Sequence, residues 1–191
     1  MLREVKTTYL ELLAEDEFRP STGFREIVEV KEVDNDAFLN FVLFAGVGLP
    51  WRWHSRLRWT MEEWDEYFNK GEIFTFLGFV NKRLAGYYEL DFTRPGEAEI
   101  KFFGILPGLV GRGLGGKLLS HAVESARAKP VKRIWLHTCS NDSETALSNY
   151  LARGFRVYRE ELNVEDVPEI HELVHLTAEF FKKYLERYPP L

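Results

Sequence analysis

One short run most constrains how this chain can fold: Val110-Gly111-Arg112-Gly113-Leu114-Gly115-Gly116, placed directly before a segment with helical spacing. A tight turn that enters a helix aims several backbone amides at one point, where the helix dipole adds a partial positive charge. The stretch between Ile100 and Val123 contains no acidic residue, whereas Lys101 and Lys117 add to the charge of Arg112. The run therefore predicts a cradle for a phosphate group, and a flexible turn is the alternative.

Size and charge narrow the class of protein. The chain has 191 residues and a formal charge of -5, which suits one domain, placed at residues 1–162, with a helical extension over 163–191. The negative charge argues against binding nucleic acids or membrane surfaces, which are polyanions. The first residues are not expected to act as a signal peptide, because no basic region followed by an apolar stretch is found there. No apolar run approaches the ~20 residues of a membrane span, and Cys139 is the single cysteine. We therefore expect a soluble cytoplasmic protein without an internal disulfide.

The spacing of apolar residues predicts a mixed α/β (α+β) fold. Short turns at 81–83 and 93–96 make the strands beside them antiparallel neighbours. Asp34 is a candidate cap for the first helix, and Thr60 with Glu63 forms a capping-box pattern for the second. The predicted strands are 4–13, 24–33, 73–80, 84–92, 97–105, 133–138 and 154–162, and the predicted helices are 36–45, 60–70, 114–128 and 142–153. We expect a mostly antiparallel central sheet with flanking helices.

The glycine run also matches two nucleotide-binding patterns in part. Gly111-x-Gly113-x-x-Gly116 fits the dinucleotide fingerprint, which requires a βαβ unit and an acidic residue about 20 positions further on. Here the preceding strand follows other short-linked strands, and the next strand, 133–138, ends without an acidic residue. The Gly-Lys-Ser/Thr ending of a nucleotide P-loop is also absent. Both readings are therefore set aside.

The run and its neighbours resemble the GNAT superfamily of N-acetyltransferases, whose motif for the pyrophosphate of acyl-CoA is Gln/Arg-x-x-Gly-x-Gly/Ala. Residues 110–115 fit this motif, with Val110 where Gln or Arg is usual; one side-chain contact is lost and the backbone donors remain. The segment 103–107 is similar to the family's strand-to-turn segment, and 146–155 to its second motif. The resemblance covers roughly residues 72–160.

This resemblance implies a GNAT-like acyl-CoA N-acyltransferase fold that binds acetyl-CoA and needs no metal. In that family the pantetheine arm lies between two splayed parallel strands, here 97–105 and 133–138. The family often has an Asn seven residues before its catalytic tyrosine, where this chain has Ser143, with Asn141 two places earlier. The residues implied to contact the cofactor are Phe103, Ile105, Val110, Gly111, Arg112, Gly113, Leu114, Gly115, Gly116, Lys117 and Asn141.

Acetyl transfer to an amine needs a base, because an amine with a pKa of ~10 is protonated near neutral pH. Glu99 is the first candidate, since Glu99-Ile100-x-Phe102-x-x-Ile105 resembles the strand on which histone acetyltransferases of this superfamily carry their base. Glu89 on the adjacent strand is the reserve, and a base acting through water stays open. The alternative is a solvated strand face shared by Glu97, Glu99 and Lys101.

Departure of the CoA thiolate is easier when the sulfur is protonated, and a tyrosine hydroxyl is a suitable donor. Tyr150 stands where the family places this tyrosine. The alternative is an aromatic side chain in the core, because Leu147, Tyr150 and Leu151 lie on one side of the predicted helix.

The loop 50–59 combines three tryptophans with three arginines. In the resembling family this loop borders the acceptor pocket, so Trp51, Trp53 and Arg56 are candidates for stacking on an acceptor ring or pairing with its carboxylate. They equally suit a loop clamped on the fold, and single-stranded nucleic acid is a weaker alternative.

The tail contains His171-Glu172-Leu173-Val174-His175, which matches the H-E-x-x-H pattern of zinc peptidases. A third ligand is needed, and Glu179 lies ~12 Å along the same helix, too far to join both histidines. An apolar stripe over 170–185 instead indicates a helix that docks on its own fold or on a second subunit as a homodimer.

The function predicted from these patterns is acyl-CoA-dependent N-acyl transfer, with acetyl passing from acetyl-CoA to a primary amine of a small molecule or peptide by direct attack. Two alternatives belong to other classes: a non-catalytic acyl-CoA-binding or sensor domain, and, more remotely, a zinc peptidase.

Overall fold

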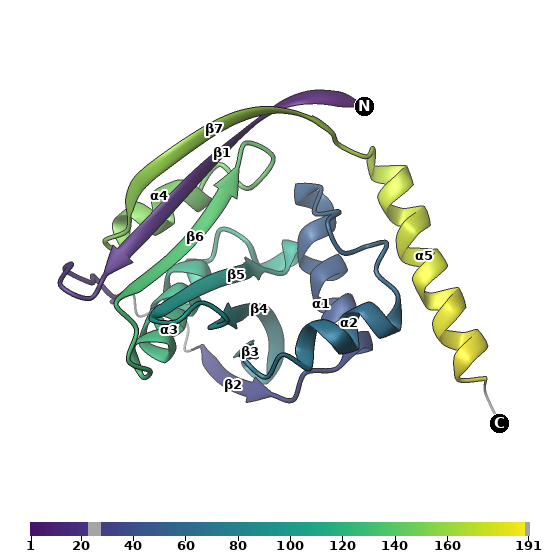
Figure 1. Ribbon diagram of the computed structural model, residues 1–191, viewed down its shortest axis with the longest axis horizontal. Helices are drawn as coiled ribbons and strands as arrows, with labels where there is room; N and C mark the ends of the chain where they lie inside the picture. Colours follow the sequence, from purple (N-terminus) through teal and green to yellow (C-terminus); the bar gives the residue numbers. More distant parts are fainter. Residues whose placement is uncertain (23–27, 190–191) are drawn as a thin grey trace.

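The computed structural model describes residues 1–22 and 28–189. Over these residues the chain forms a seven-stranded sheet with helices on both faces (Figure 1). The strands are β1 (Leu2–Leu13), β2 (Glu29–Val33), β3 (Ile73–Val80), β4 (Arg83–Asp91), β5 (Glu97–Ile105), β6 (Arg133–Cys139) and β7 (Arg156–Asp166). The helices are α1 (Ala37–Gly48), α2 (Met61–Phe68), α3 (Leu114–Arg127), α4 (Ala146–Ala152) and α5 (Ile170–Arg187), with 3₁₀ turns at Leu49–Trp51 and Pro107–Leu109.

The sheet has the order β2-β3-β4-β5-β6-β1-β7. Its neighbouring strands are antiparallel except for β5 and β6, which are parallel. A parallel pair needs a crossover connection, and α3 supplies it. The prediction of a mixed, mostly antiparallel sheet with flanking helices is confirmed.

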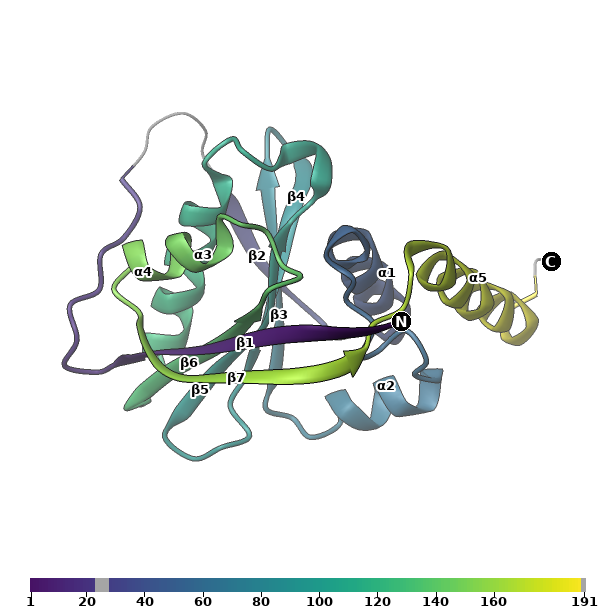
Figure 2. The ribbon, with the colours of Figure 1, turned by 90° about the horizontal axis from the view of Figure 1, so that it is seen from above.

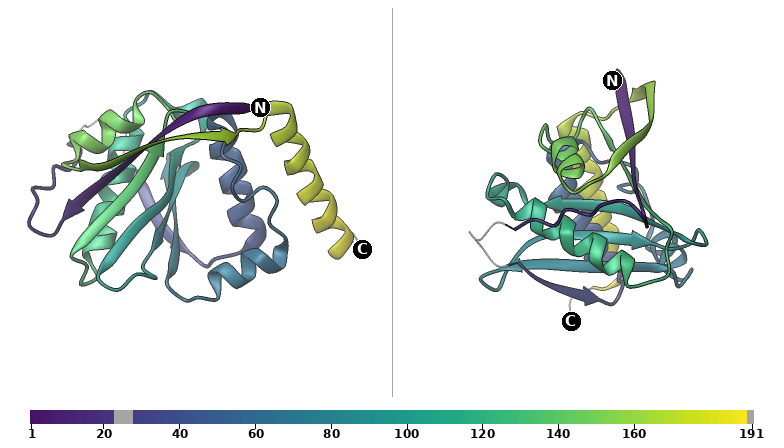
Figure 3. Two further views of the ribbon diagram at one scale, coloured as in Figure 1. Left: turned by 45° about the horizontal axis from the view of Figure 1, so that its top comes forward. Right: turned by 90° about the vertical axis from the view of Figure 1, so that its left-hand side faces the viewer.

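The first strand of the chain occupies a place that local patterns do not predict. β1 pairs with β6 from Thr7↔Cys139 to Leu13↔Arg133 and with β7 from Leu2↔Asp166 to Glu11↔Arg156. It therefore lies between two strands that follow it by more than a hundred residues. Together β1 and β7 form a long ribbon that leads toward α5 (Figure 3).

Helices cover the two faces unequally (Figure 2). α3 and α4 pack on one face, where the largest core cluster joins Leu118 and Leu119 to strand residues such as Leu90 and Ile134. α1 and α2 lie on the other face, and α5 packs outside α1. The rings of Phe41 and Phe180 stack with centroids 3.5 Å apart, so α5 docks on its own chain.

The boundaries of the elements agree with the sequence predictions only in part. The capping box of Thr60 and Glu63 is present as predicted. Asp36, and not Asp34, caps α1, because its side chain accepts a hydrogen bond from the Leu39 amide. Residues 24–27 of the second predicted strand lie outside the described residues, and β7 continues past residue 162 to Asp166.

α4 begins later than the predicted start at residue 142, because the Asp142 carboxylate binds the end of β6 instead of opening a helix. Within the described ranges, no helix is both long and apolar enough to cross a membrane.

Candidate active site

The glycine run forms an open turn at the start of α3. Gly111 and Gly113 have φ of 85° and 78°, a backbone region that glycine enters without strain. Apart from chain neighbours, no described atom lies within 4 Å of where a Cβ would stand on either residue. Gly113 is the N-cap of α3 and brings no side chain of its own to the helix end. Space therefore lies open beside the start of α3, where the first helix amides have no partner within the helix, as a phosphate cradle requires.

β5 and β6 separate next to this turn. Their ladder runs only from Glu97↔Arg133 to Glu99↔Trp135, although β5 continues to Ile105 and β6 to Cys139. Figure 1 shows the two strands diverging beyond these pairs. On its other side β5 stays paired with β4 up to Ile105. The β5 edge from Ile100 to Ile105 therefore has backbone groups that β6 does not use, as the predicted splayed pair requires.

A cavity of about 900 Å³ joins the glycine turn to this opening. Its wall combines β5, β6, α4, the loop after α1, and the β1–β7 ribbon. Cofactor residues predicted from the sequence that line it are Phe103, Ile105, Val110, Gly111, Gly113, Leu114, Gly115, Gly116 and Asn141. Arg112 and Lys117 stand on the same turn but do not line it. The predicted cofactor residues are thus largely brought together at one cavity.

Tyr150 lines the same cavity from α4. Its side chain is buried, and its ring lies 6.1 Å from that of Phe103 between centroids. Burial, together with the nearby charge of Asp142, raises the pKa of the Tyr150 hydroxyl far above its ordinary value. The phenol therefore keeps its proton at neutral pH and can donate it.

The predicted base Glu99 lies beside a cationic and a neutral partner. Its Oε2 atom accepts a hydrogen bond from Lys101 Nζ at 2.9 Å, and its Oε1 atom lies 3.8 Å from His137 Nδ1. The Glu99 side chain is only 7% exposed, whereas that of His137 is 44% exposed. His137 and Lys101 line the cavity, and Glu99 does not.

Trp53 ties the loop after α1 to the end of β6. Its Nε1 atom donates to Asp142 Oδ1 at 3.0 Å, while Asp142 Oδ2 accepts from Thr138 Oγ1 and from the Cys139 amide. Trp51 and Trp53 both line the cavity. This part of the loop therefore forms a wall of the predicted acceptor end.

Comparison with known proteins identifies the family of the chain. Residues 27–155 match the model of the Acetyltransferase (GNAT) family. The chain belongs to this family. The match contains the glycine turn, both splayed strands and Tyr150, whereas β1, β7 and α5 lie outside it.

Individual relatives support the assignment. The chain is 36% identical over 93 residues to the uncharacterized N-acetyltransferase YvbK of Bacillus subtilis (strain 168), a match that covers 49% of this chain and 58% of YvbK. A Bacillus subtilis acetyltransferase solved in complex with CoA is 25% identical, with a TM-score of 0.54, over 70% of this chain and 79% of that one. A GCN5-related N-acetyltransferase from Sphaerobacter thermophilus shares the fold at 16% identity and a TM-score of 0.63, covering 88% and 54%.

Besides Arg112, Lys117 and Glu99, two further predicted site residues of this GNAT chain, Arg56 and Glu89, do not line the cavity. Arg56 and Glu89 are 3% and 1% exposed and bind each other, with Arg56 Nη1 2.9 Å from Glu89 Oε1 and 3.1 Å from Oε2. Neither residue lines the cavity. The guanidinium also lies over the rings of Trp59, Trp64, Tyr67 and Phe102. This pair clamps the loop onto β4, which was the alternative reading of the loop.

Several cavity residues are missed by local patterns. Tyr9 and Glu165 reach the cavity from β1 and β7, and His137 from β6. A signal for His137 exists, because Trp135, His137 and Cys139 alternate on one face of a strand. No such signal exists for Tyr9, whose place beside His137 depends on the pairing of β1 with β6.

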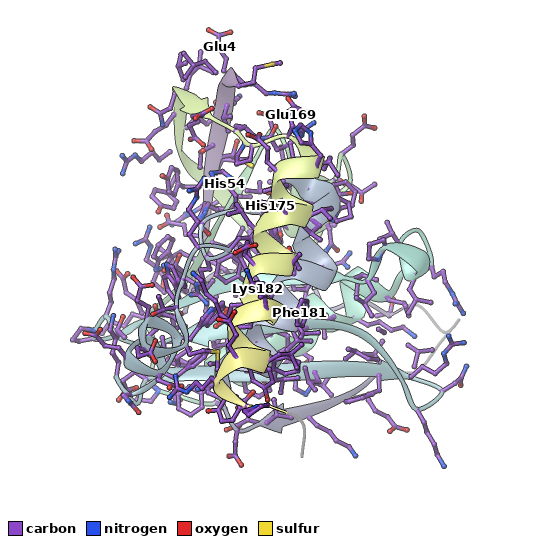
Figure 4. All side chains as sticks on the ribbon, turned by 90° about the vertical axis from the view of Figure 1, so that its right-hand side faces the viewer. Glu4, His54, Glu169, His175, Phe181 and Lys182 are labelled. Atoms are coloured by element: carbon purple, nitrogen blue, oxygen red, sulfur yellow. The ribbon has the colours of Figure 1, made fainter. Side chains whose placement is uncertain are left out.

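The H-E-x-x-H segment forms the first turn of α5. Glu172 accepts a hydrogen bond from the Glu169 amide and completes a capping box. His175 is an exposed residue of α5 (Figure 4) and lines a second, smaller pocket together with Arg58 and Asp166. Among the described residues, no group of three or more metal-ligating side chains comes together. The local role of Glu172 is therefore to satisfy the helix end.

The glycine turn gives a direct test by substitution. Gly113→Ala is expected to raise the Kd for acetyl-CoA by about 10-fold, because a left-handed residue with a Cβ costs ~1–2 kcal/mol and the turn relaxes away from the cradle geometry. Isothermal titration calorimetry measures this change.

Gly71→Ala is the matched control. Gly71 also has a positive φ, of 74°, no described atom apart from its chain neighbours lies within 4 Å of where its Cβ would stand, and it does not line the cavity. The Kd of this variant should stay within about twofold of the wild-type value, because the same backbone cost falls away from the cradle. Equal Kd values for Gly113→Ala and the wild type would contradict the assignment of the cradle.

Proposed function

We propose that this chain transfers an acetyl group from acetyl-CoA to a primary amine by direct attack. One observation carries the proposal: a single cavity joins the open glycine turn, the splayed edge of β5 and the hydroxyl-bearing Tyr150. Its membership of the GNAT family supports acyl-CoA as donor, as does the similar Bacillus subtilis acetyltransferase that binds CoA.

The donor would bind with its pyrophosphate at residues 111–116. The amides at the start of α3 supply hydrogen-bond donors for this anion, and Arg112 and Lys117 add positive charge beside the turn. The pantetheine arm would lie along β5 and bind the backbone groups of Phe103 and Ile105; β6 pairs with β5 only at residues 97–99 and leaves this part of the edge unused. The glycine turn and this strand edge would then hold the two ends of the donor.

The acetyl group would then meet the amine beside Tyr150 and His137. In the reaction the amine nitrogen forms a bond to the thioester carbonyl carbon, the carbon–sulfur bond breaks, and Tyr150 donates a proton to the departing sulfur. The nitrogen loses the proton that restores the tyrosine. The acceptor end has Tyr9, Trp51 and Trp53 as aromatic walls and Glu165 as an acidic group, which suits a cationic amine.

The single cysteine supports direct attack. Cys139 lines the cavity, but burial together with the charge of Asp142 raises the pKa of its thiol to about 11. A thiol with this pKa is neutral near pH 7, and the thiolate is the nucleophilic form. An acetyl-cysteine intermediate is therefore not part of the proposed mechanism.

The proposal is tested first by binding and then by turnover. Acetyl-CoA at about 100 times its Kd should add ~2.7 kcal/mol of stability, which raises Tm by several degrees. Zinc should give no comparable shift. Thiol release from acetyl-CoA is then followed with a panel of primary amines.

Three results distinguish the candidate classes. Amine-dependent thiol release supports the transferase. Binding of acetyl-CoA without turnover on any amine would favour the acyl-CoA sensor. Stabilisation by zinc alone, with peptide cleavage that a chelator abolishes, would favour the peptidase.

A further inference from the structure

His137 lines the cavity beside the β5–β6 opening. Glu99 does not line the cavity, and its Oε2 atom accepts a 2.9 Å hydrogen bond from Lys101 Nζ. A base must reach the proton it removes, directly or through one water. His137 meets this condition by its exposure, and Glu99 stands directly behind it at 3.8 Å.

We propose that His137 removes the proton from the acceptor amine and that Glu99 is a positioning residue that orients the imidazole. This assignment rests on the proposed acetyl transfer to an amine. In this assignment Glu99 orients the His137 imidazole and does not itself contact the substrate.

The geometry selects the reacting nitrogen of the imidazole. Nδ1 lies on the Glu99 side, at 3.8 Å from Oε1. A carboxylate favours the tautomer that carries its proton on the nearer nitrogen. The lone pair is then on Nε2, the nitrogen that Glu99 does not face. When Nε2 takes a proton, the Glu99 charge stabilises the resulting imidazolium.

The ring is also held from the side by the first strand. Tyr9 is the β1 residue paired with His137, and the two rings lie 5.7 Å apart between centroids. The Tyr9 hydroxyl donates to Glu161 Oε2 on β7 at 2.9 Å, which fixes the tyrosine in turn. The strand that local patterns could not place therefore completes the surroundings of His137.

Partial burial of the ring, together with three charged groups around it, sets the pH range in which His137 can accept a proton. Glu99 and Asp142 favour its protonated form, whereas Lys101 opposes it. Burial is the largest influence and lowers the pKa of His137 below its ordinary value of 6.5. Near pH 7 the imidazole is therefore neutral and able to accept a proton, and it becomes unable to do so as the pH falls through this lowered pKa.

The proton balance is complete without another reactant. An ammonium and a thioester give an amide, a thiol and one proton. His137 takes that proton from the ammonium nitrogen and passes it to solvent through the exposed side of its ring. The second proton lost by the nitrogen replaces the one that Tyr150 gives to sulfur.

The test compares His137→Gln, Glu99→Gln and His175→Gln, the last being an exposed histidine on α5 away from the cavity. The measured quantity is kcat between about pH 4.5 and 9, a range that extends well below the ordinary histidine pKa, because kcat reports groups in the bound complex and not the free amine. His137→Gln should lower kcat by about 100-fold. It should also abolish the fall of kcat at acidic pH, while the Kd for acetyl-CoA stays within about twofold.

Two further measurements separate a chemical role from a structural one. Glu99→Gln should move the acidic limb to lower pH, since the imidazolium loses the charge that stabilises it. Added imidazole should restore part of the activity of His137→Ala and none of that of Tyr150→Phe. His175→Gln should match the wild type.

The outcomes distinguish this proposal from the proposed function. A wild-type enzyme that turns over an amine, with an acidic limb that persists unchanged in His137→Gln, would overturn the role of His137 alone. A wild-type chain that binds acetyl-CoA and turns over no amine would overturn the proposed function and this role together.

Discussion

Replacing Tyr150 by phenylalanine should lower kcat by about 100- to 1000-fold, within the range of general acid catalysis. The ring would still fill its place between Phe103 and Phe155, so stability and acetyl-CoA affinity should change little. The substitution removes only the hydroxyl group. Without it, the CoA sulfur would leave as an unprotonated thiolate, a poorer leaving group than the thiol.

Steady-state kinetics, a thermal melt and calorimetry check these three quantities on one preparation. Tyr184→Phe is the matched control, because this tyrosine lies on α5 and does not line the cavity. A Tyr150→Phe variant with wild-type kcat would remove Tyr150 as the acid. A variant with a lowered Tm as well would point to the packing role that the sequence left open.

Replacing Arg56 by methionine should lower the free energy of unfolding by about 3–5 kcal/mol, the usual cost of leaving one member of a buried ion pair alone. Glu89, 1% exposed, would lose its partner. The same change would remove the cation from the rings of Tyr67 and Phe102, which lie 4.0 and 4.4 Å from the guanidinium carbon. Urea denaturation followed by tryptophan fluorescence measures the loss.

The same substitution at an exposed pair is the control. Arg187 binds Glu62 with side chains 44% and 73% exposed, so Arg187→Met should cost less than about 1 kcal/mol. The double variant Arg56→Met/Glu89→Leu should regain most of the lost stability, because apolar groups can replace a buried pair. A cost below about 1 kcal/mol for Arg56→Met would contradict the clamp.

Residue spacing alone predicts most of the strands and the helix in the middle part of the chain. The hairpins β3–β4 and β4–β5 follow from short turns, and α3 from the glycine turn and the apolar spacing after it. Glu99 was correctly placed on β5, yet whether a strand residue faces a cavity depends on its neighbours. Glu99 contacts Lys101 and His137, which line the cavity while Glu99 does not. The alternation of side chains along a strand does not reveal these contacts.

The loop 50–59 shows the same limit. The sequence pattern allows two roles for its tryptophans and arginines, contact with the acceptor or attachment of the loop to the fold. The structure shows that different residues of the loop take different positions. Trp51 and Trp53 line the cavity, while Arg56 is buried against Glu89. Two residues three positions apart in a loop differ in role because one finds a buried carboxylate on β4 and the other does not.

By itself, the sequence determined that residues 110–116 form a glycine-rich turn before a helix, because glycine backbone freedom and helical spacing are properties of a few neighbouring residues. Only the tertiary structure decided that β1 enters the sheet between β6 and β7, and that Tyr9 therefore lies against His137. That pairing joins residues more than a hundred positions apart. Its stability comes from hydrogen bonds and packing along the whole ribbon, and no local stretch of residues encodes it.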